Sequence, residues 1–248
     1  MHGCCAAQQA LARPPNFARY QDFNEVFNPP TVPQWHDRYT VLLRAAAALS
    51  VNGFAALKRA IVTGQYHKPS GVYFGGRGPD KEASLRVLQA FVARTFPSPS
   101  QVVTLDVHTG LGPTGMDSMM VSSEQTRARA AAVFKTAYTV ESPLSAGSNA
   151  ASGYQDALGV SVLRGTWPHV KDVLDVTQEF GTVAGIFVAR ATILENAAYQ
   201  NAPGSPQHAA TRAMLKDVFM VPTAAWKRSV VERGLAAFKE AANHLSGR

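Results

Sequence analysis

One apolar run that ends in a histidine and a glycine-rich turn constrains the fold of this chain most. Residues 102–107 read Val-Val-Thr-Leu-Asp-Val, a composition typical of a buried β-strand. His108 follows directly, and the glycines and Pro113 behind it end the strand. We therefore expect His108 at the end of a strand, where α/β proteins collect their ligands.

A second run of the same kind covers residues 173–178 and delivers Glu179 just before Gly181. A histidine and a carboxylate on neighbouring strand ends could together hold a metal ion and activate a water molecule. Asp106 lies two residues before His108, so the two side chains of a strand would point to the same face. Asp106 could orient the imidazole, and an ordinary hydrogen-bonded aspartate explains it equally well.

The remaining sequence predicts helices and strands in alternation, without a repeat or an interdomain linker. Such alternation is typical of a single α/β domain, here a three-layer αβα arrangement around a mixed central sheet. We expect strands over 102–107, 159–163 and 175–179, and helices over 35–63, 82–96, 124–138, 170–174, 182–199, 205–219 and 223–245.

Composition excludes several classes of protein. The net charge of +7 is spread evenly along 248 residues, which argues against a nucleic-acid-binding footprint. No apolar stretch is long enough to span a membrane, and no secretory signal is visible, so we expect no membrane partner. Cys4 and Cys5 are the only cysteines, so a disulfide framework is absent and a cytoplasmic location is favoured. The role of this cysteine pair stays open.

The two strand-end motifs also carry a family resemblance. Asp-Val-His-Thr-Gly-Leu-Gly-Pro at 106–113 and Gln-Glu-Phe-Gly-Thr at 178–182 resemble the C-terminal signatures of the family of domain of unknown function 2817. That family is a branch of the zinc carboxypeptidase-like superfamily. Further segments resemble it in the same order, namely 64–67, 71–76, 194–196, 219–222 and 226–227. The resemblance covers residues 16–248 and leaves residues 1–15 as an unassigned tail.

The resemblance implies a zinc carboxypeptidase-like fold and a zinc-dependent hydrolysis of small peptide-like or acylated amino-acid substrates. In that reaction His108 would be a zinc ligand and Glu179 the general base. The family's His-x-x-Glu zinc motif is absent, since none of the seven histidines has Glu three residues later. The segment 14–17 reads Pro-Pro-Asn-Phe and lacks the family's arginine. We therefore expect an incomplete metal site and an N-terminally truncated domain.

Four further residues are candidates for a substrate pocket. Tyr154 resembles the mobile tyrosine with which carboxypeptidases contact their substrates, although ordinary loop packing is the simpler explanation. His67 could line the pocket or belong to a structural turn. Gly110 and Gly112 could let the backbone approach the metal, or form a tight turn without a ligand.

Three hypotheses about function remain. The chain could be a zinc-dependent carboxypeptidase or amide hydrolase. It could instead be an inactive relative that binds a partner and forms homo-oligomers through an exposed sheet edge. A nucleic-acid-binding role is the weakest, because basic and aromatic residues do not cluster. Whether the chain is an enzyme is left open by the sequence.

Overall fold

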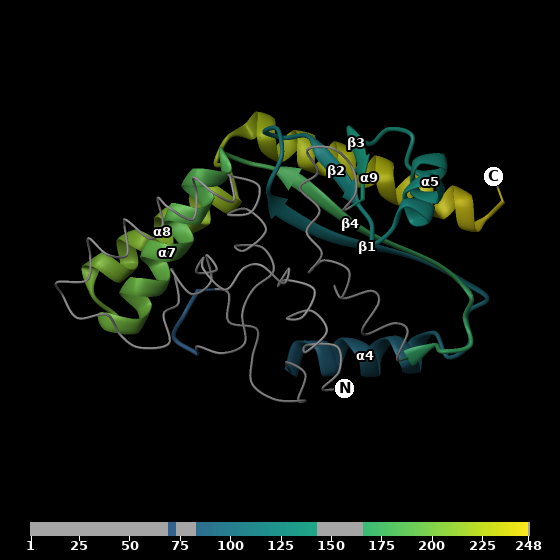
Figure 1. Cartoon of the computed structure of the whole chain (residues 1–248), viewed down its shortest axis with the longest axis horizontal. Coiled ribbons are helices and arrows are strands. Elements are labelled where there is room, and N and C mark those ends of the chain that lie inside the picture. Colours follow the sequence, from purple (N-terminus) through teal and green to yellow (C-terminus); the bar gives the residue numbers. More distant parts are fainter. Residues whose placement is uncertain (1–68, 73–82, 143–165, 248) are drawn as a thin grey trace, which may run out of the picture. The chain divides into compact units, whose positions relative to one another are not determined.

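The computed structural model describes residues 69–72, 83–142 and 166–247, and the fold is given for these ranges alone. The chain divides into two compact units, Met1–Glu82 and Ala83–Arg248, and every element below belongs to the second unit. In chain order these elements (Figure 1) are α4 Ala83–Thr95, β1 Gln101–Gly110, β2 Asp117–Met120, α5 Glu124–Val133, β3 Thr139–Glu141, β4 Asp172–Gly181, α7 Gly185–Asn201, α8 Pro206–Phe219 and α9 Ala224–Leu245.

The four strands form an open mixed sheet with the order β1-β4-β2-β3. β1 and β4 are parallel, β4 and β2 are antiparallel, and β2 and β3 are parallel. The predicted mixed α/β fold is confirmed at this level for the described part of the chain. The third layer and the carboxypeptidase-like type of fold stay predictions.

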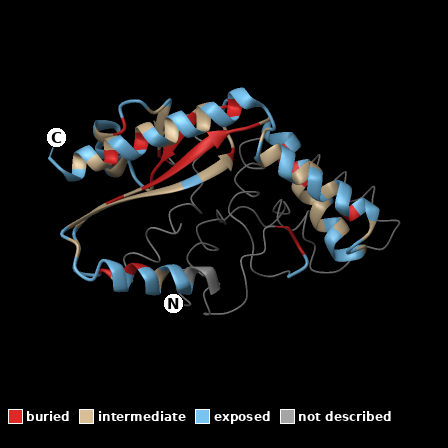
Figure 2. Ribbon diagram, turned by 180° about the vertical axis from the view of Figure 1, so that it is seen from behind, coloured by how far each residue is buried: buried red, intermediate tan, exposed pale blue. Residues whose placement is uncertain are grey.

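The two faces of the sheet differ in polarity because side chains alternate along each strand. Helices α5 and α9 cover the apolar face, and Figure 2 shows the buried strand β4 beneath them. The buried core of this face consists of Met119, Val121, Ala130, Phe134, Leu174, Val176, Ala237 and Ala241. The opposite face of β1 and β4 carries Thr104, Asp106 and His108 beside their register partners Asp175, Thr177 and Glu179.

Several predicted boundaries need correction. The expected helix over 170–174 is wrong, because β4 begins at Asp172 and pairs with β1 over ten residues. The helix predicted over 124–138 ends at Val133, since β3 follows at Thr139. Ser123 caps this helix, with its Oγ accepting a hydrogen bond from the backbone N–H of Thr126 at 3.1 Å.

The other helices agree with the sequence prediction to within a few residues. α7 and α8 pack against each other, and His208 of α8 lies 3.4 Å from Glu195 of α7. The predicted helix over 35–63 and the predicted strand over 159–163 lie outside the described residues. Within the described ranges, no helix combines the length and the apolar character that crossing a membrane requires.

Candidate functional site

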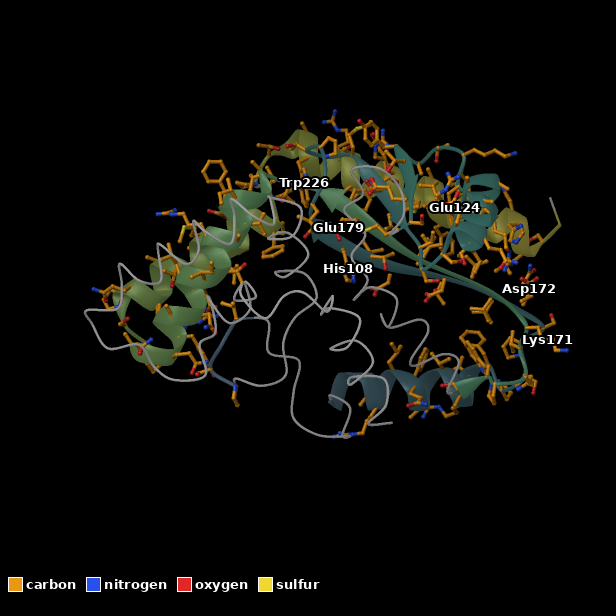
Figure 3. The ribbon with its side chains drawn as sticks, viewed as in Figure 1. His108, Glu124, Lys171, Asp172, Glu179 and Trp226 are labelled. Atoms are coloured by element: carbon orange, nitrogen blue, oxygen red, sulfur yellow. The ribbon has the colours of Figure 1, made fainter. Side chains whose placement is uncertain are left out.

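His108 and Glu179 are direct neighbours across two parallel strands. They are register partners near the C-terminal ends of β1 and β4, so their side chains leave the same face of the sheet. The His108 Nδ1 lies 3.9 Å from the Glu179 Oε2 (Figure 3). The predicted convergence of this imidazole and this carboxylate is therefore confirmed.

Asp106 places a second carboxylate beside the same imidazole. Its Oδ2 lies 3.0 Å from the His108 Nε2, on the opposite side of the ring from Glu179. The hydrogen bond and negative charge of Asp106 raise the pKa of His108, although burial acts in the opposite direction. The predicted contact with Asp106 thus exists, and it favours a protonated imidazole in the protein without metal.

Glu179 is the buried member of this trio. Its side chain is only 2% exposed, whereas the side chain of His108 is 34% exposed. One carboxylate oxygen accepts a hydrogen bond from the backbone N–H of Leu111 at 2.9 Å. The other oxygen, Oε2, has no hydrogen-bond partner among the described residues. Burial raises the pKa of Glu179, against the opposing effect of the Leu111 N–H.

The loop after β1 folds back over the end of β4, and glycines make this possible. Gly110 and Gly112 have φ values of 148° and 112°, a region that favours glycine. A Cβ on Gly110 would lie 3.5 Å from the Glu179 Oε1. A Cβ on Gly181 would lie 2.1 Å from the carbonyl oxygen of Pro113. Gly110 and Gly112 thus form the turn in which the Leu111 N–H donates its hydrogen bond to Glu179.

Trp226 and Thr182 fix this loop, and the sequence did not single them out as site residues. The Trp226 Nε1 donates a hydrogen bond to the carbonyl oxygen of Gly181 at 2.9 Å. The Thr182 Oγ1 donates one to the carbonyl oxygen of Gly110 at 3.1 Å. Both residues are buried. A buried tryptophan after the motif Phe-Met-Val-Pro was the available signal, but its partner could not be read from the sequence.

Among the described residues, His108 could act as a metal ligand. His108 has the oriented imidazole of a typical zinc ligand, because a carboxylate holds its other nitrogen. No group of three or more His, Cys, Asp or Glu side chains within the described ranges could hold a metal ion. The predicted pocket residues His67 and Tyr154 lie outside the described residues. The structure thus brings together Asp106, His108 and Glu179 of the predicted site.

The fold and the site define a mixed α/β protein with a histidine between two carboxylates at one end of its sheet. A family described as "Protein of unknown function (DUF2817)" matches residues 8–233. The chain belongs to this family. No curated protein and no solved structure matches the chain.

Proposed function

We propose that this chain is a zinc carboxypeptidase-like amide hydrolase in which Glu179 is the general base and His108 is a metal ligand. The observation that supports this most is the buried Glu179 Oε2, which lies 3.9 Å from the imidazole of His108. A base must stand within reach of the water that the metal would hold. Zinc bound by His108 would supply a water molecule with a pKa near neutrality.

Three residues of the chain would transfer the proton or position the groups that do so. Burial raises the pKa of Glu179 above its ordinary value, which suits a group that takes a proton from water and passes it to a leaving amine. The Leu111 N–H fixes one carboxylate oxygen and leaves the other to accept that proton. Asp106 holds the imidazole ring in one orientation, so the ring position does not depend on the metal.

The proposed zinc site needs more ligands than the described residues provide. Catalytic zinc sites use three protein ligands and a water molecule. His2 and His67, which lie outside the described ranges, are the distant candidates that the sequence offers. The proposed substrates are small peptide-like molecules or acylated amino acids.

Metal binding tests the ligand role of His108 independently of any activity. Calorimetric titration with zinc should show one site in the wild type and a large loss of affinity in His108→Ala. His169→Ala, which removes an exposed histidine, serves as a matched control and should leave zinc affinity unchanged. Equal zinc affinity in His108→Ala and wild type, or no zinc binding in either, would refute the proposed site.

Hydrolysis tests the role of Glu179. Glu179→Gln should keep zinc affinity and lose about 10² to 10⁴ in kcat against N-acyl amino acids, because it lacks a proton acceptor. Asp217→Asn, at an exposed carboxylate of α8, is the control and should retain full activity. A wild type that binds zinc but hydrolyses no peptide-like or acylated substrate would favour the second candidate below.

The second candidate is an inactive relative that acts as a binding or interaction protein. One observation favours it. β1 is an edge strand in the sheet of the described residues, and its Val107 is exposed. An edge strand offers unpaired backbone groups to another chain. Lys or Pro substitution along β1 that abolishes self-association without affecting zinc binding would support this candidate.

A further inference from the structure

The outer side of α9 carries an apolar stripe that the described part of the chain leaves exposed. Val231, Leu235, Phe238 and Leu245 are exposed by 59, 54, 65 and 45%. Another side of α9 is buried through Trp226, Ala237 and Ala241, and the colours along this helix alternate accordingly in Figure 2. We call the exposed set, together with the half-buried Ala242, the α9 stripe.

The spacing of the α9 stripe is that of a coiled-coil seam. Its members follow one another by steps of four, three, four and three residues along the helix. A stripe with this period stays on one side of a helix that pairs with another helix over several turns. Scattered surface side chains need no explanation, but a continuous seam of this kind is typical of a helix–helix interface.

We propose that the α9 stripe binds the α9 stripe of a second copy of this chain, with the two helices antiparallel. The centre of the pair would lie between Leu235 and Phe238, so each Leu235 faces Phe238 of the second copy. Each Val231 would then face Ala242 of the second copy, which places a larger side chain against a small one. A two-fold axis generates both contacts twice and closes the dimer.

Charges beside the stripe favour this antiparallel register. Glu232 and Lys239 follow Val231 and Phe238 directly, on the same flank of the stripe. In the antiparallel pair, the contact of Leu235 with Phe238 is next to the contact of Val231 with Ala242. Glu232 of one copy and Lys239 of the second copy both lie between these two contacts, so opposite charges meet twice. A parallel pair would bring Arg228 against its own counterpart, where like charges repel, whereas the antiparallel pair places Arg228 opposite Leu245 of the second copy.

The other charged residues near the middle of α9 are already engaged with their own chain. Arg233 forms an ion pair with the buried Asp117 at 2.7 Å, and Glu240 accepts a hydrogen bond from the Thr136 N–H at 3.0 Å. Within the described part of the chain, neither Glu232 nor Lys239 forms an ion pair. This division assigns one set of charges to the fold and the other to the proposed interface.

Gly234 supports the same assignment. It lies in the middle of α9, where glycine weakens a helix, and an added Cβ would meet no atom within 4 Å. The described fold therefore gives no reason for a glycine here. Gly234 precedes Leu235 at the edge of the stripe, where the lack of a side chain lets a second helix approach closely.

Sedimentation analysis of the full chain at about 1 to 100 µM tests the proposal, because weak and moderate dimers dissociate in this range. The wild type should show a monomer–dimer equilibrium, and Phe238→Glu should raise the dimer Kd by about 30-fold or more. Phe187→Glu on α7 is the matched control, since Phe187 is 57% exposed but lies outside the stripe. Circular dichroism verifies that both variants fold.

Charge reversal tests the orientation of the two helices. Glu232→Lys alone and Lys239→Glu alone should each raise the dimer Kd by about three- to tenfold, since exposed ion pairs are weak. The double variant E232K/K239E should restore wild-type affinity, because it recreates both pairs in the antiparallel register. A monomer at all concentrations, a dimer that tolerates Phe238→Glu, or a double variant that stays weak would overturn the proposal.

Discussion

The substitution Gly181→Ala should destabilise the protein strongly. An added Cβ would lie 2.1 Å from the Pro113 carbonyl oxygen and 2.5 Å from the backbone carbon and oxygen of Gly112. All three are backbone atoms, so no side chain can turn away to make room. The loop after β1 would have to move from the end of β4 by about 1 Å, judged against normal van der Waals separations.

Three hydrogen bonds oppose that movement. The Gly181 carbonyl oxygen accepts from the Gly115 N–H at 2.8 Å and from the Trp226 Nε1 at 2.9 Å. The Gly181 N–H donates to the Met116 carbonyl oxygen at 2.9 Å. Each contributes about 0.5–1.5 kcal/mol, and overpacking alone costs about 1–3 kcal/mol. We therefore expect Gly181→Ala to lower the free energy of unfolding by about 3–5 kcal/mol.

Urea unfolding followed by tryptophan fluorescence measures this effect. With an m-value of about 2 kcal/mol/M, a loss of 3 kcal/mol lowers the midpoint by roughly 1.5 M. Gly185→Ala at the start of α7 is the control, because its Cβ would only make an ordinary contact with the Leu111 side chain at 3.8 Å and should raise stability by about 0.5–1 kcal/mol. A midpoint for Gly181→Ala within about 0.3 M of wild type would refute the close packing of the loop on β4.

Three further predictions concern the site. Asp106→Asn should lower the pKa of His108 in the metal-free protein, because it removes the main interaction that raises this pKa while burial remains. NMR titration of the His108 ring protons measures the pKa, and an unchanged value contradicts the prediction. Glu179→Gln should become more stable relative to wild type as pH rises above 4.5, because the raised pKa makes ionisation of Glu179 costly only in the folded state. Urea unfolding at pH 5 and 7 tests this. The same difference in the free energy of unfolding between variant and wild type at both pH values would exclude it. Trp226→Phe should lose about 1–2 kcal/mol of stability with its hydrogen bond to Gly181, and an unchanged urea midpoint would show that this bond is unimportant.

The pairing of His108 with Glu179 could be predicted because each follows an apolar run that suits a buried strand. Parallel neighbours bring their C-terminal ends to the same edge, so two strand-end residues meet whenever the strands are adjacent. The helices α8 and α9 could be predicted because the capping residues Ser205 and Thr223 mark their starts. These signals are local and do not depend on the rest of the fold.

Tertiary pairing determines what the sequence did not reveal. Asp172 and Val173 join β4 because β1 offers ten consecutive register partners, although the local sequence also suits a helix. β2 and β3 contain four and three residues, too few for a periodic pattern. The need for glycine at position 181 arises from the backbone of Gly112 and Pro113, far away along the chain.

Packing explains the glycines of the two motifs, but it does not explain their charged residues. Gly110 and Gly181 are required by backbone geometry, so a protein without any activity would need them as well. Glu179 is different, because burying a carboxylate with one unpartnered oxygen costs stability and the described contacts return only one hydrogen bond. A glutamine would keep the bond to Leu111 and avoid the buried charge. The presence of Glu179 beside His108 and Asp106 therefore favours selection for chemistry over selection for stability. A Glu179→Gln variant that is more stable than wild type at pH 7 would be direct evidence that Glu179 is kept at the expense of stability.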